Sequence, residues 1–61
     1  MSHLNQVELQ NLRHIISEHD TAREKLQSYA QQATDPEVRK FFESSAQDAQ
    51  STRQQLLSFL K

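Results

Sequence analysis

The 61-residue chain contains no cysteine, no glycine and a single proline. Without cysteine no disulfide can form, and the absence also fits a reducing, intracellular compartment. Without glycine the chain cannot carry a Rossmann fingerprint or a P-loop, because both need glycines where the backbone approaches a phosphate. Nor is there a glycine to expose a nucleophilic serine on a sharp turn. We therefore expect no enzyme activity and no cofactor.

Long hydrophobic runs are also missing. No stretch approaches the roughly 20 apolar residues that span a membrane, and the N-terminus lacks the basic and apolar regions of a signal peptide. The seven basic and eight acidic side chains are spread along the chain and give a formal net charge of −1. A general nucleic-acid-binding protein would concentrate positive charge on one face. The sequence thus predicts a soluble, cytoplasmic protein with no membrane partner and no general affinity for nucleic acid.

The only strong break in the sequence is Thr34-Asp35-Pro36-Glu37. Asp35 can cap a helix, Pro36 suits the first helical position, and Glu37 complements the positive end of the helix dipole. Proline also disfavours the α conformation at the residue before it. An earlier helix should therefore end near Ala33.

The start of that earlier helix has its own signals. Asn5 and Glu8 have the spacing of a capping box, with asparagine in place of the usual serine or threonine. Leu4 and Leu9 fall where a hydrophobic staple would lie. A helix is therefore expected to begin at residue 5.

These signals predict one domain over residues 1–61, with a helix over 5–33, a turn at 34–35 and a second helix over 36–60. The short connection requires the two helices to be antiparallel neighbours. Such a hairpin buries even less surface than the roughly 60% that a compact domain of this size buries. Because disulfides are excluded and no cluster of metal ligands is apparent, self-association is the remaining common source of stability.

Apolar residues recur at intervals of three and four along both predicted helices. The faces that they form are broader than contact between two helices requires. We therefore predict an all-α fold, an antiparallel two-helix hairpin that dimerises into a four-helix bundle. The residues expected to carry self-association are Leu12, Ile15, Ile16, Leu26, Phe41, Phe42, Leu56 and Phe59.

Pairing the helices outward from the turn brings Tyr29 near Phe42 and places bulky residues at both ends of the core. The middle is predicted to be narrow and partly polar, formed by His19, Ala22, Ser45, Ala49 and Thr52. His19 is the notable residue here, because buried polar groups need partners. We interpret it as a structural histidine that Thr52 or Ser45 could satisfy.

A metal site is the alternative interpretation, with His19, Glu8, His14 and Glu18 as candidate ligands. His14 and Glu18 have i, i+4 spacing, but they lie on the flank of the apolar face. Glu8 lies about 16 Å from His19 along the helix, so these two cannot share a metal within one chain. Across a dimer they could, but Glu8 is more simply interpreted as a cap residue. A ferritin-like di-iron site uses Glu-x-x-His, and that motif does not occur.

An RNA-binding helical-hairpin dimer is a third hypothesis, because small dimers of this shape can bind RNA across a bundle face. The available basic groups are Arg23, Lys25, Arg39, Lys40 and Arg53. Acidic residues lie close to them in the sequence, which favours a solvated face of mixed charge.

Residues 29–42 read Tyr-Ala-Gln-Gln-Ala-Thr-Asp-Pro-Glu-Val-Arg-Lys-Phe-Phe, and glutamines follow at positions 47, 50, 54 and 55. This pattern resembles the hairpin turn of ferritin-like helical proteins, in particular the coat F family of bacterial spore proteins. The resemblance covers about half of the chain and implies a half-bundle that dimerises in a spore-forming bacterium. It does not imply iron chemistry, because the Glu-x-x-His ligands are missing. The resulting hypothesis is a non-catalytic, self-associating structural or interaction module with a spore-associated role.

Overall fold

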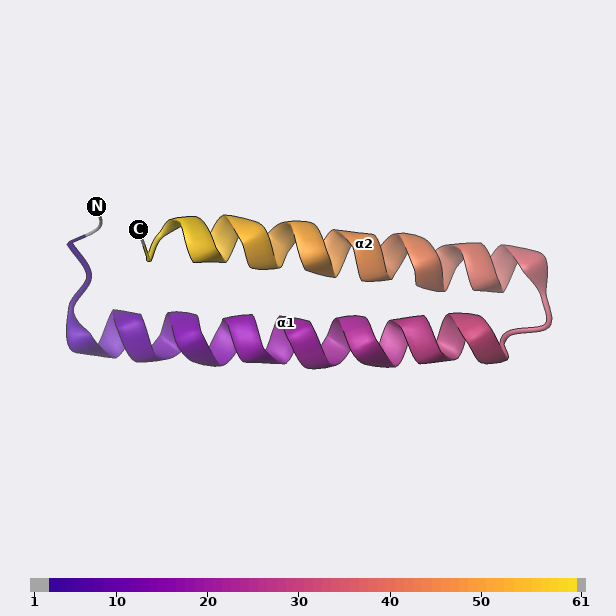
Figure 1. Ribbon diagram of the computed structural model, residues 1–61, viewed down its shortest axis with the longest axis horizontal. Helices are drawn as coiled ribbons and strands as arrows, with labels where there is room; N and C mark the ends of the chain where they lie inside the picture. The colour runs from indigo at the N-terminus through magenta and orange to yellow at the C-terminus, as the bar shows by residue number, and fades with distance from the viewer. Residues whose placement is uncertain (1–2, 61) are drawn as a thin grey trace.

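The computed structural model describes residues 3–60, which form two antiparallel helices lying side by side (Figure 1). Helix α1 spans Gln6–Gln32 and helix α2 spans Pro36–Ser58. The start of α1 and the end of α2 lie at the same end of the molecule, and the turn lies at the other. The predicted all-α hairpin is confirmed, with each helix boundary within two residues of its expected position.

The capping box at the start of α1 is present. The side-chain oxygen of Asn5 accepts a hydrogen bond from the backbone N–H of Glu8 at 2.8 Å, and the Glu8 carboxylate accepts one from the backbone N–H of Asn5 at 3.1 Å. Two backbone donors that the helix itself cannot satisfy are thereby paired. Leu4 and Leu9 are both half-buried, as a staple would require.

The turn also follows its local signals. One Asp35 carboxylate oxygen accepts from the backbone N–H groups of Glu37 and Val38, at 2.8 and 3.0 Å. Pro36 occupies the first turn of α2, where its missing N–H costs nothing. Asp35 is therefore the N-cap of α2, as predicted.

A contact that the sequence did not indicate closes the other side of the turn. The Arg39 guanidinium, on α2, donates to the backbone carbonyl of Ala33 at 2.8 Å. Ala33 is the C-cap of α1, and carbonyls at a helix end have no partner within their own helix. An arginine of the second helix thus provides a hydrogen-bond donor for a carbonyl at the end of the first helix.

Helix α2 ends two residues earlier than predicted. The N–H of Phe59 bonds to the carbonyl of Leu56 at 3.1 Å, and that of Leu60 bonds to Leu57 at 3.0 Å. These are i to i−3 bonds, so the last turn tightens and the α-helix stops at Ser58.

The two helices form a single layer. Among residues 3–60 only Ile16, Ala30 and Ala46 are buried. The molecule measures 46 × 15 × 10 Å, and its radius of gyration is 14.3 Å, against about 10.5 Å for a compact chain of this length. Domains normally bury the apolar side of one layer against a second layer, and a lone hairpin has no second layer.

Candidate interaction surface

Large apolar side chains are exposed along one long side of the hairpin. Ile15, Ala22 and Tyr29 are spaced by seven residues, so they lie nearly in line along α1. On α2, Phe41 and Phe59 are separated by 18 residues, which is five full turns and returns to the same line. We call these residues, with Val38, the apolar face.

Exposure on this face is high for residues of this type. The exposed fraction is 66% for Phe41, 52% for Phe59 and 46% for Tyr29. Near the turn Tyr29 and Phe41 form a ring cluster with Phe42, whose ring lies 5.6 Å from that of Tyr29 and 6.1 Å from that of Phe41. The Tyr29–Phe42 contact also confirms the predicted pairing of the two helices.

The eight residues predicted to carry self-association divide into two groups. Ile16 is buried inside the hairpin, and Leu12, Leu26, Phe42 and Leu56 are half-buried along the seam between the helices. Ile15, Phe41 and Phe59 are exposed on the apolar face. Tyr29 and Val38 are exposed beside this second group, although they are not among the eight predicted residues. The sequence did carry a signal for both residues: Tyr29 lies seven residues after Ala22, and Val38 lies 21 residues before Phe59.

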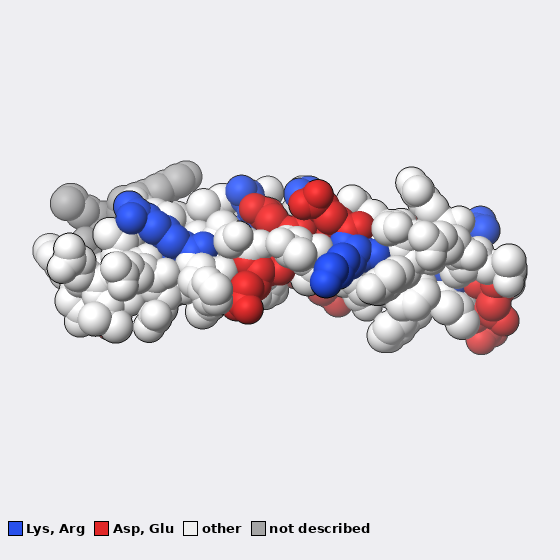
Figure 2. Space-filling view, turned by 90° about the horizontal axis from the view of Figure 1, so that it is seen from below, with Lys and Arg blue, Asp and Glu red and all other residues white. Residues whose placement is uncertain are grey.

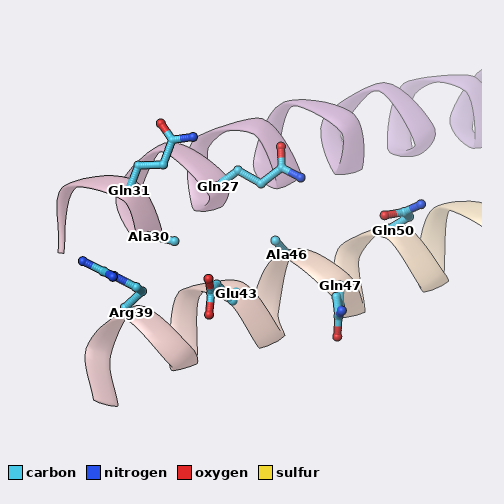
Figure 3. A pocket seen from close by; sticks show the side chains of 8 residues that line it. All are labelled: Gln27, Ala30, Gln31, Arg39, Glu43, Ala46, Gln47 and Gln50. Atoms are coloured by element: carbon cyan, nitrogen blue, oxygen red, sulfur yellow. The ribbon is translucent and has the colours of Figure 1, made fainter. Parts of the chain in front are cut away.

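The opposite long side carries a groove of about 690 Å³, which Figure 3 shows from close by. We call it the glutamine groove. Its lining residues are Gln27, Ala30, Gln31, Arg39, Glu43, Ala46, Gln47 and Gln50. Ala30 and Ala46 project into the space between the helices, and the longer polar side chains extend around them. Amide groups both donate and accept hydrogen bonds, so this side can be fully hydrated.

A two-residue step separates the two sides. Consecutive helical residues are about 100° apart, so Tyr29 points about 200° away from both Gln27 and Gln31. Phe41 has the same relation to Glu43. The apolar face and the glutamine groove therefore lie on opposite sides of the same seam.

The middle of the seam contains charged residues that sequence reasoning missed. Arg53 on α2 forms an ion pair with Asp20 on α1, and Arg23 lies 3.9 Å from the same carboxylate oxygen. The three side chains, which we call the polar cluster, are about one-third exposed, at 32–34%. Their facing atoms, Asp20 Oδ1 and the Nε atoms of both arginines, are buried.

The polar cluster corrects the predicted composition of the middle. His19, Ser45, Ala49 and Thr52 are half-buried as expected, but Ala22 is exposed. Charged side chains are expected to face the solvent, so the sequence did not indicate that Asp20 and Arg53 pair across the seam. The i, i+3 spacing of Asp20 and Arg23 was the only signal on the sequence.

His19 is bonded within its own helix. Its Nδ1 lies 2.8 Å from the backbone carbonyl of Ile15, which can only accept, so Nδ1–H is the donor. The expected partners were Thr52 and Ser45 across the seam. A histidine side chain on a helix leans back over the preceding turn, which brings His19 to the carbonyl four residues earlier.

The other candidate metal ligands are kept apart. Glu8 serves in the capping box of α1. His14 Nε2 lies 3.7 Å from Glu18 Oε2, and both side chains are largely exposed. Within residues 3–60, no three histidine, aspartate or glutamate side chains come close enough together to hold a metal ion. The structure therefore does not assemble the four candidates into one site.

On the long side that Figure 2 shows, the basic residues are not gathered into a patch. Figure 2 shows acidic and basic side chains interleaved along the middle of one long side, with further charged side chains toward both ends. Arg53 and Arg23 face Asp20, and Arg39 is bonded to Ala33. Three of the five basic groups considered for RNA binding are thus engaged within the chain.

The chain matches no protein-family model, no curated protein and no solved structure. The resemblance to coat F and ferritin-like proteins therefore stays a prediction. Within residues 3–60, neither helix is long and apolar enough to cross a membrane.

Proposed function

We propose that this chain is a non-catalytic self-association module, in which two hairpins pack through their apolar faces into a four-helix bundle. The observation that carries the proposal is the amount of exposed surface. The hairpin exposes 4974 Å², whereas a compact monomer of 7.1 kDa exposes about 4,100 Å². The excess of about 900 Å² is close to the roughly 800 Å² that each partner buries in a standard interface.

The chemistry of the apolar face supports a contact between two copies from which water is excluded. Burial of apolar surface is worth about 25 cal/mol per Å², and the exposed rings of Tyr29, Phe41 and Phe59 are the largest contributors. A second copy offers the same apolar face, so both uncovered surfaces are removed from water together. The single layer then becomes two layers around one core.

The alternatives are less well supported. A metal-binding half-bundle would need ligands that converge, but His19 is bonded to Ile15 and Glu8 serves as a cap. An RNA-binding dimer would need a positive face, but charges of both signs are interleaved on the long side that Figure 2 shows. The cytoplasmic location and the spore-associated role are part of our proposal and rest on the sequence alone.

Sedimentation equilibrium at micromolar concentration tests self-association directly. We expect twice the 7.1 kDa chain mass and a melting temperature that rises with protein concentration, because association stabilises the folded state by mass action. Two further measurements test the alternatives: a gel shift with RNA, and thermal melting with added zinc or iron. A folded monomer whose melting does not depend on concentration would refute the proposal, and stoichiometric metal or salt-sensitive RNA binding would favour the alternatives.

A further inference from the structure

We infer that the second copy binds in reverse, so that the turn of one hairpin lies beside the chain ends of the other and α1 packs antiparallel to the partner's α1. This inference deepens the proposed self-association and rests on it. It follows from how bulk and charge are distributed along the apolar side of the hairpin.

Bulk is concentrated at the two ends of that side. The contact between Tyr29 and Phe42 sets the level of the helices near the turn. Ala22 and Ala49 are each seven residues further from the turn, so they lie at the same height along the long axis of the hairpin. One step beyond them come His19 and Thr52. We call this middle part of the hairpin the waist. It contains a layer of small residues, Ala22 and Ala49, next to a layer of larger, polar residues, His19 and Thr52.

A dimer in which both hairpins point the same way would stack equal levels on each other. Ala22 and Ala49 of both copies would form a layer of four alanines, next to a layer of two histidines and two threonines. Protein cores are packed as densely as organic crystals, and a layer of alanines beside an overfilled layer leaves a void. Reversal about a point between residues 20 and 21 avoids this conflict.

In the reversed arrangement, Ala22 and Ala49 of one copy meet His19 and Thr52 of the other. Each of the two waist layers then contains two alanines, one histidine and one threonine, so large residues face small ones. A shallow hollow of about 310 Å³ lies at Ala22, lined also by Ser17, Glu18, Thr21 and Lys25.

Charge on the rim of this hollow agrees with the reversal. Glu18 and Lys25 lie on either side of Ala22 along α1, and both are exposed. Reversing one α1 against the other brings Glu18 of each copy within about 3 Å, measured along the axis, of the level of Lys25 in its partner. Two symmetric ion pairs result. In the same-direction dimer Lys25 would instead approach Asp48, which lies seven residues from Phe41 on α2.

Charge reversal with selective rescue separates the two arrangements. Lys25→Glu places like charges opposite each other twice, and we expect the dimer dissociation constant to rise about tenfold at low salt. Adding Glu18→Lys should restore the wild-type value, whereas adding Asp48→Lys should not. Rescue by Asp48→Lys alone, or no effect of Lys25→Glu, would overturn the reversed arrangement while leaving self-association intact.

A distance measurement gives an independent readout. The chain has no cysteine, so Gln32→Cys provides a single exposed site for a nitroxide label near the turn. Reversed copies place the two labels about 35 Å apart along the axis, whereas same-direction copies place them at one level. A short distance between labels would overturn the inference, and a monomer with no measurable coupling would refute the proposed function as well.

Discussion

The apolar face and the glutamine groove run along the same two helices and flank the same seam, yet they present opposite chemistry. Tyr29 is 46% exposed on one side, and Gln27 and Gln31 line the groove on the other. Amides on a solvated side cost nothing, whereas exposed aromatic rings lose the free energy that burial would provide. One side of the hairpin is thus polar and suited to solvent, whereas the other side leaves apolar surface exposed to water.

The most direct test of this difference is to add one negative charge to each side in turn and compare the effects on association. We expect Tyr29→Glu to weaken the dimer by at least about 100-fold, because it puts a carboxylate into an apolar interface. Gln31→Glu makes a matched change two residues away, on the glutamine groove, and should leave the dissociation constant within about threefold of wild type. Sedimentation equilibrium measures both. Equal effects of the two variants would mean that the apolar face is not the interface.

A second test concerns the seam between the two sides. Asp20 lies seven residues before Gln27, on the groove side, and holds Arg53 and Arg23 together. Asp20→Ala leaves two partly buried guanidinium groups facing each other, so we expect a loss of about 2 kcal/mol in the free energy of unfolding. Urea unfolding at fixed protein concentration measures it.

The control for the polar cluster is Glu24→Ala, which removes an exposed carboxylate from the same helix. It should change the free energy of unfolding by no more than about 0.5 kcal/mol. If both variants lose the same amount, the polar cluster contributes no more than an ordinary surface pair.

The smallest effect is expected at His19, the neighbour of Asp20 on the apolar side of the seam. His19→Leu removes one hydrogen bond to the Ile15 carbonyl and adds apolar contact, so the free energy of unfolding should stay within about 1 kcal/mol of wild type. Melting with and without zinc or iron completes the test. A metal-dependent rise in melting temperature that the variant abolishes would assign His19 to a metal site.

Much of the fold could be predicted because its signals are local. Asn5 and Glu8, or Asp35 and Val38, are three residues apart, and their hydrogen bonds form in any chain that adopts the helix start. The contact of Arg39 with Ala33 was not predicted, because a guanidinium on a long side chain has many possible partners. The polar cluster was missed for a similar reason: Asp20 and Arg53 are 33 residues apart, and only the packed hairpin brings them together.

The sequence by itself determined two helices, their caps, their antiparallel pairing and the presence of apolar faces too wide for one hairpin. Only the tertiary structure decided where the seam runs within those faces. Ile16, Ala30 and Ala46 became the buried residues, while Ile15 and Ala22, which share the same periodicity, were left outside. The physical reason is that helical periodicity identifies a broad stripe, and the rotation of each helix about its own axis depends on how both surfaces pack together. That rotation leaves one side of the stripe exposed to solvent.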